Sequence, residues 1–137
     1  MTERNDIFLR QGETFQFQYT HLENGAAVDL TGYSARMSVR TDFGGPQYAY
    51  LTDGADADCG TLTLGGVAGT VTISMTAEQT RSLVDNIPVF GFPDEMYARY
   101  ENRHKAELVY DLELQDGAGA VIRSIEGKII VYREVTR

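Results

Sequence analysis

Hydrophobic and polar residues alternate with a period of two along most of this chain. The stretch TFQFQYTHL places Phe15, Phe17 and Tyr19 on one face and polar side chains on the other. The stretch GYSARMSVR alternates in the same way between residues 33 and 40. A period of two is typical of strands with one buried face, so we expect a strand in each stretch.

Short strands are also expected in DIFLRQG, YAYLT, GTLTLGG and GTVTISM, where apolar residues are bounded by turn residues. Near the end of the chain, KAELVYDLELQDG and AVIRSIEGKIIVYREV alternate around the turn DGAG, which predicts a long hairpin. Gly127 lies inside its second strand. A glycine there indicates a bulge or a close backbone approach.

One segment, TAEQTRSLV, departs from this alternation. Thr76 and Gln79 have the spacing of a capping box, which predicts about two turns of helix over residues 77–84. Seven to nine short strands and one short helix are typical of an all-β fold. We therefore expect an antiparallel β-sandwich, immunoglobulin-like in type, formed by residues 1–137 as a single domain. Residues 1–5 are expected to form a flexible arm.

The net charge of the chain bears on which classes of partner it can bind. The net charge is −8 and the sequence pI is about 4.6. Nucleic acids and anionic membrane surfaces are bound through clustered Lys and Arg, so neither partner is expected. No apolar run approaches the length of a membrane span, and MTERNDIFLRQ has no signal-peptide core. We expect synthesis in the cytoplasm.

Few residues suggest metal or cofactor chemistry. His21 ends a strand and His104 lies in a polar stretch, and neither belongs to a zinc-binding spacing. Cys59 is the one cysteine and is expected to be structurally neutral. No cofactor is expected.

The acidic stretch DGADAD raises the question of calcium. Asp53, Asp56 and Asp58 do not follow the ligand spacing of an EF-hand loop. A solvated loop is the preferred interpretation, and a weak surface calcium site stays open as an alternative.

Motifs for catalysis are missing from the sequence. None of the serines lies in a GxSxG elbow, and no glycine-rich phosphate loop follows a strand. We therefore do not expect an enzyme.

Residues 86–104 form an irregular aromatic insertion with the sequence NIPVFGFPDEMYARYENRH. It is too apolar for a solvated linker, so it either covers the domain's own core or forms a patch that another chain covers. Five of its side chains are expected at a subunit contact: Phe90, Phe92, Met96, Tyr97 and Tyr100.

Two parts of the chain resemble small virion structural proteins of tailed bacteriophages. That group opens with R-x-G-[DE]-[TD], a strand, a turn and VDLTGY-[TS]-A-x-M-x-[VI]-R, and closes with G-T-[VI]-x-[IL]-x-[LM]-[ST]-A-x-x-T and a hairpin that starts YDLEL and ends EVTR. The opening half is also similar to the N-terminal domain of siphophage upper baseplate proteins. The group commonly lacks the insertion at 86–104. The matching residues here are Arg10, Gly12, Glu13, Thr14, 28–35, Met37, Val39, Arg40, 69–80 and 110–137.

The resemblance implies a structural part of a phage particle, at the tail or baseplate or where a tail fibre attaches. Its partners would be other phage structural proteins in a symmetric assembly or homo-oligomer, held by buried aromatics and pairing at sheet edges. Glu107, Asp111 and Glu113 share one face of the hairpin, which would be solvated or meet Arg residues of a partner. Head decoration or a neck position is an alternative. A carbohydrate-binding β-sandwich module is another.

Overall fold

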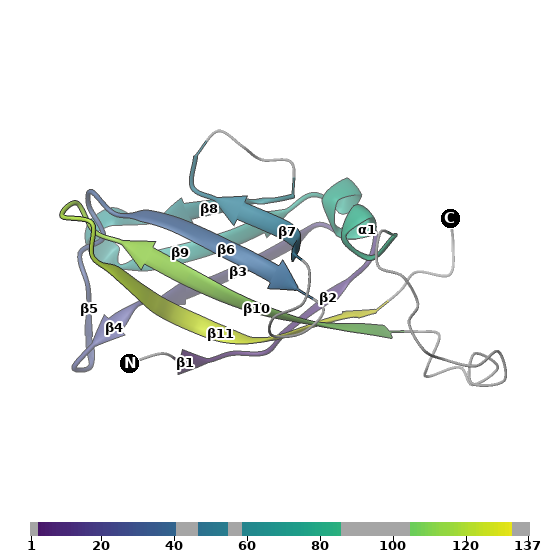
Figure 1. Cartoon of the computed structure of the whole chain (residues 1–137), viewed down its shortest axis with the longest axis horizontal. Helices are drawn as coiled ribbons and strands as arrows, with labels where there is room; N and C mark the ends of the chain where they lie inside the picture. Colours follow the sequence, from purple (N-terminus) through teal and green to yellow (C-terminus); the bar gives the residue numbers. More distant parts are fainter. Residues whose placement is uncertain (1–2, 41–46, 55–58, 86–104, 133–137) are drawn as a thin grey trace, which may run out of the picture.

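The computed structural model describes residues 3–40, 47–54, 59–85 and 105–132 (Figure 1). Within them, strands dominate and one α-helix occurs. The elements are β1 (Glu3–Arg4), β2 (Ile7–Arg10), β3 (Phe15–Thr20), β4 (Leu22–Glu23), β5 (Ala26–Ala27), β6 (Ser34–Arg40), β7 (Gln47–Thr52), β8 (Thr61–Leu64), the 3₁₀ turn η1 (Gly66–Ala68), β9 (Thr70–Met75), α1 (Ala77–Asp85), β10 (Lys105–Gln115) and β11 (Val121–Tyr132).

The strands form one curled sheet whose two halves face each other as a sandwich (Figure 1). The order is β1-β11-β10-β6-β7-β8-β9-β3, with β2 also paired to β11 and with β4 and β5 in a separate small hairpin. In Figure 1, β6, β10 and β11 lie in front of β3, β8 and β9. The predicted all-β class with one short helix is confirmed.

The prediction that the sheet is antiparallel throughout is wrong in two places. β1 and β2 both run parallel to β11, and β7 meets β8 in a single parallel pair, Thr52 with Thr61. The first case arises because β2 and β11 are not joined by a short turn. Only strands linked by a hairpin are bound to run antiparallel.

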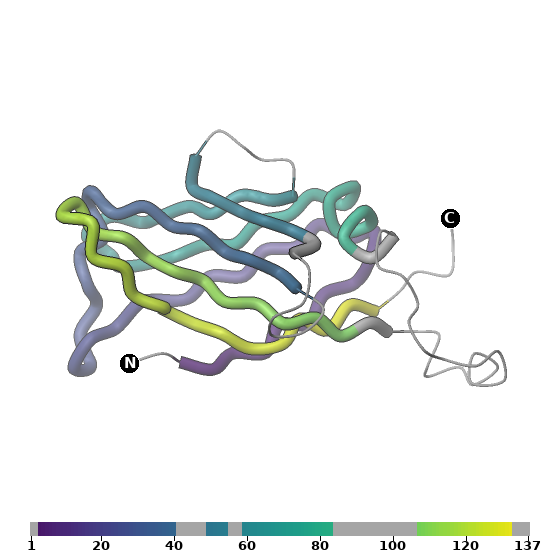
Figure 2. The backbone as a smooth tube through the Cα atoms, in the orientation of Figure 1, coloured from purple at the N-terminus to yellow at the C-terminus, as the bar shows by residue number. Residues whose placement is uncertain are grey.

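The core follows from the alternation of the long strands. In β6 and β10 every second side chain turns inward, and the backbone tube in Figure 2 shows these strands side by side along the molecule. The burial of these side chains removes apolar surface from water, which is the main favourable term in folding. The buried residues of these two strands are Ala35, Met37, Val39, Leu108, Tyr110, Leu112 and Leu114.

The capping box predicted for the helix is present. The Thr76 N–H donates to Gln79 Oε1 at 2.8 Å, and the Gln79 N–H donates to Thr76 Oγ1 at 3.2 Å. These bonds satisfy two backbone donors at the start of α1. Within the described residues, α1 is too short and too polar for a membrane-spanning helix.

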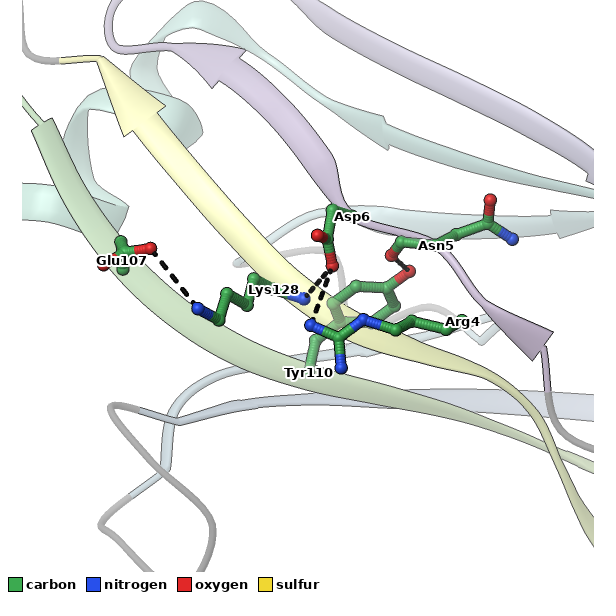
Figure 3. A network of polar contacts seen from close by, with 6 residues as sticks. All are labelled: Arg4, Asn5, Asp6, Glu107, Tyr110 and Lys128. Atoms are coloured by element: carbon green, nitrogen blue, oxygen red, sulfur yellow. Dashed lines mark hydrogen bonds and ion pairs between the residues drawn. The ribbon is translucent and has the colours of Figure 1, made fainter.

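The link between β1 and β2 passes close to Gly127 of β11. Figure 3 shows Asn5 and Asp6 of this link beside Tyr110 and Lys128. A Cβ atom at Gly127 would lie 2.3 Å from the carbonyl oxygen of Asn5. The Asn5 N–H donates to the carbonyl of Glu126 at 2.9 Å, and Asn5 accepts a bond from the Tyr110 hydroxyl at 2.5 Å. Gly127 therefore marks the close backbone approach that the sequence predicted.

The same contacts correct the expectation of a flexible arm at residues 1–5. Glu3 and Arg4 pair with β11 in the sheet, and Asn5 is held from two sides. Asp6 Oδ1 accepts the Lys128 N–H at 3.0 Å and lies 3.6 Å from the Arg4 guanidinium. Residues 1 and 2 lie outside the described residues.

Replacement of Gly127 by Ala should separate β1 from β11 and destabilise the fold by about 1–3 kcal/mol, because the new methyl group overlaps the Asn5 carbonyl. Urea unfolding measures the loss. Gly117→Ala is the matched control, since its Cβ would come no closer than 3.9 Å to the Gly32 carbonyl. Equal losses in the two variants would contradict the close-contact argument.

Candidate functional site

The interface predicted from the sequence lies outside the described residues. This holds for all five of its members: Phe90, Phe92, Met96, Tyr97 and Tyr100. Asp56, Asp58 and His104 also lie outside them. The contact expected there therefore stays a prediction.

A β-bulge in β11 creates a polar cluster inside the sandwich. Leu112 pairs with Ile125 and Glu113 pairs with Arg123, so Ser124 has no partner in β10. An extra residue of this kind turns its side chain to a new face. Ser124 and Ile125 consequently both point inward, and Ser124 is 2% exposed.

Ser124 links β3 to β11 through its hydroxyl. Tyr19 donates its hydroxyl proton to Ser124 Oγ at 2.9 Å, and Ser124 Oγ lies 2.9 Å from His21 Nδ1. Because Ser124 accepts from Tyr19, its own proton is available for Nδ1, which fits the His21 tautomer protonated at Nε2. Among the described residues, His21 Nε2 has no hydrogen-bond partner, and it lies 3.7 Å from Glu23 Oε1.

The three side chains contact one another in the order serine, histidine, carboxylate, as the groups of a hydrolytic triad do. Here, however, the serine hydroxyl is covered and both of its neighbours are protein groups. A nucleophile must reach a substrate atom, and the described hydrogen-bond partners of this oxygen are the protein groups Tyr19 and His21. The geometry fits a hydrogen-bonded link between β3 and β11 rather than a reaction centre.

Sequence reasoning singled out His21 at the end of a strand but missed Ser124. The alternation changes phase in part: Ile122 is apolar at an even position and Ile125, Ile129 and Val131 at odd positions, but Val121 and Ile130 depart from this pattern. Such a break in a two-residue period indicates an extra residue between positions 122 and 125. We had expected either a bulge or a close backbone approach at Gly127. The bulge in β11 lies earlier in the strand, at Ser124.

A second polar junction joins the β2–β3 turn to α1. The Gly12 N–H donates to Thr80 Oγ1 at 3.0 Å, and Thr80 Oγ1 can donate in turn to the carbonyl of Glu13 or Ala77. Gln11 Nε2 donates to the carbonyl of Arg81 at 3.1 Å. The Thr80 side chain is fully buried, so this contact is shielded from water.

The outward face of the hairpin carries a ladder of ion pairs. Glu113 contacts Arg36 at 2.7 Å, Asp111 lies 3.5 Å from Arg123, and Glu107 lies 3.7 Å from Lys128. Burial raises the pKa of Asp111, and the Arg123 charge partly opposes this. The three acids that we expected to be solvated or to meet a partner's Arg residues therefore meet cations of their own chain.

Two surface depressions share Asp53. One has a volume of about 430 Å³ and is bordered by Leu30, Tyr33 and β8, and the other has about 250 Å³ beside Arg36 and Glu113. Asp53 Oδ1 already accepts the Ala35 N–H at 3.2 Å. In the part of the chain that the structure describes, no three His, Cys, Asp or Glu side chains gather as a metal-binding group.

Comparisons with known proteins give fold-level likeness only. No protein-family model matches the chain, and no curated protein matches it. Drosophila OTK, extracellular domains 3–5, is 19% identical with a TM-score of 0.35, over 94% of this chain and 32% of that one. Zebrafish RET cadherin-like domains 1 to 4 are 12% identical with a TM-score of 0.36, over 98% of this chain and 23% of that one. The chain thus spans a third or less of these structures, and neither likeness bears on function.

Thr80→Val should destabilise the fold by about 1–3 kcal/mol, because the Gly12 N–H would lose its buried acceptor while the side-chain shape is kept. Chemical denaturation measures the change. Thr63→Val on the exposed face of β8 is the control and should stay within about 0.5 kcal/mol of the parent. A loss at Thr80 no larger than that at Thr63 would show that the junction is not stabilising.

Stability should fall with pH in the range where tyrosines ionise. Burial raises the pKa of Tyr19 from 10.0 to about 12, with Ser124 opposing and Glu3 adding to the shift. Between these values the folded state holds a proton that the unfolded state has lost, so a rise in pH favours unfolding. The stability difference between the parent and Tyr19→Phe should shrink from pH 9 upward in urea titrations. A stability difference that stays constant with pH would contradict the raised pKa of Tyr19.

Proposed function

We propose that this chain is a structural protein of a tailed-bacteriophage virion, placed at the tail or baseplate or where a tail fibre attaches. It would act by protein–protein assembly. The support is the resemblance in sequence, together with the positions that the matching residues occupy in this fold.

The opening motif VDLTGY specifies a tight turn and a core anchor. Asp29 Oδ1 accepts the Thr31 N–H at 2.9 Å and the Thr31 hydroxyl at 2.6 Å. The Thr31 hydroxyl and then its N–H lower the pKa of Asp29. Leu30 is 1% exposed, and Gly32 has a φ of +84°, which favours glycine.

The closing motif specifies the hairpin. Asp116 Oδ1 accepts the N–H groups of Ala118 and Ala120, each at 2.9 Å, which holds the turn between β10 and β11. Gly119 has a φ of +93°, and Gly127 lies where the N-terminal segment crosses. The motif residues are therefore those that fix turns and close contacts.

One observation carries the proposal: the two separate motif regions contact each other through Thr80. Gly12 and Glu13 belong to the opening motif, and Thr80, which ends the T-A-x-x-T stretch, lies 68 residues after Gly12 and 67 after Glu13. The two stretches that carry the resemblance are therefore in contact within one structural unit of this chain. A shared unit of this kind favours a shared role in the particle.

The fold is suited to such a role. The β10–β11 pair is long, its outward face is tied together by ion pairs, and it is bordered by β6 on one side and by β1 and β2 on the other. A stiff scaffold of this type presents loops and edges in fixed positions for neighbouring subunits. Preorganised surfaces lose less entropy when they bind.

The test is the presence of the chain in purified phage particles from a host that carries its gene. Quantitative mass spectrometry should find it at a fixed ratio to a known tail protein and far below the major head protein. A copy number close to that of the head protein would favour head decoration instead. Its absence from particles would overturn the proposal.

The aromatic insertion gives a sharper prediction. Replacing Phe90, Phe92 and Tyr97 with Ala should block incorporation while the isolated domain stays folded, because interface aromatics carry much of the binding energy. Particle composition and circular dichroism measure the two effects. Val67→Ala, at a side chain that is 76% exposed, is the control. Loss of folding in the triple variant would assign these residues to the core.

A further inference from the structure

β3 is an outer strand with an open edge. It pairs with β9 alone among the strands that the structure describes, from Phe15 with Met75 to Thr20 with Thr70. The opposite end of the sheet is built differently, since β1 and β2 there carry the charged residues Glu3, Arg4 and Arg10. β3 contains no charged residue.

The pairing with β9 determines which backbone groups lie on the open edge. His21 donates its N–H to the carbonyl of Gly69 at 2.8 Å, in register with the β3–β9 ladder. In an antiparallel ladder, residues alternate between the two neighbours. Odd-numbered residues of β3 therefore bond to β9, and Gln16, Gln18 and Thr20 direct their N–H and C=O groups away from it.

Two features make this edge suited to pairing. Natural sheets protect their edges with charges, proline or bulges, and β3 has none of these. Its inward side chains, Phe15, Phe17 and Tyr19, are only half-buried against the core although they are aromatic. A strand added at the edge would cover these rings and satisfy the outward backbone groups.

We propose that the open edge of β3 pairs with β3 of a second copy of this chain, antiparallel about a two-fold axis at Phe17. The two sheets then continue into one another. This inference concerns the isolated chain and does not rest on a role in a phage particle.

The sequence of β3 is complementary to itself in this register. A two-fold axis perpendicular to the sheet leaves the inward faces of the two copies on the same side. Odd-numbered residues of one copy must therefore oppose odd-numbered residues of the other, and even-numbered residues must oppose even-numbered ones. With the axis at Phe17, Phe15 opposes Tyr19 of the other copy and Gln16 opposes Gln18, so aromatic meets aromatic and amide meets amide. Such cross-strand pairs stabilise sheets.

The flanking residues favour the same axis. An axis moved to Gln18 would bring Glu13 opposite Glu23, and like charges directly opposed are destabilising. The absence of charge within β3 lets two copies approach at this edge despite a net charge of −8 each.

Light scattering after size exclusion, over a range of concentrations, tests the dimer. The parent chain should behave as a dimer. Gln16→Lys with Gln18→Lys opposes lysines across the axis and should raise the dissociation constant by about tenfold or more. The control is Thr63→Lys with Val67→Lys, which adds the same charge at exposed positions away from the edge and should leave the dimer intact. A monomeric parent, or a dimer that survives the edge lysines, would overturn the proposal.

Cysteine cross-linking tests the register without relying on a disruptive variant. In a Cys59→Ser background, Gln16→Cys and Gln18→Cys chains of different tag length are refolded together and oxidised. Opposed residues lie about 5.5 Å apart between Cα atoms, within disulfide range, so the mixed pair should cross-link. Gln18→Cys alone should not, since diagonal neighbours lie about 7–8 Å apart. No mixed product, or efficient cross-linking of Gln18→Cys alone, would overturn the proposed axis.

Discussion

The pairing register of β10 with β11 is the constraint on which the rest of the structure depends. β6 pairs with the free side of β10, and β1 and β2 pair with the free side of β11, so the positions of three other strands are set by this one ladder. A slip of one residue would turn every side chain to the opposite face. The bulge at Ser124 makes one such slip within β11, and Ile122 and Ile125 both remain directed to the interior as a result.

Local patterns in the sequence were sufficient for most elements. Alternation located the long strands, and the spacing of Thr76 and Gln79 located the helix and its cap. Gly127 indicated a close approach, which the crossing of Asn5 explains. These features depend on neighbouring residues or on the absence of a side chain, so a single sequence contains them.

Features that depend on distant partners were not predicted. The parallel pairing of β2 with β11 joins residues more than a hundred positions apart, and no local pattern distinguishes it from an antiparallel pair. Thr80 was expected only as a helical residue, yet its hydroxyl joins α1 to the turn after β2. The acids of β10 were assigned to solvent or to a partner because the positions of Arg36 and Lys128 across the strands could not be read from the sequence.

The parallel course of β2 and β11 has a mechanical consequence. A pull applied before Glu3 and after Tyr132 draws β1 and β2 in one direction and β11 in the other, along the axis of the strands (Figure 1). The ladder is then loaded in shear, and its hydrogen bonds resist together instead of opening one after another. The crossing at Gly127 lies in the middle of this ladder and adds the Asn5 and Asp6 bonds to those that oppose the pull. Tension along the strands is therefore shared among the hydrogen bonds of this ladder.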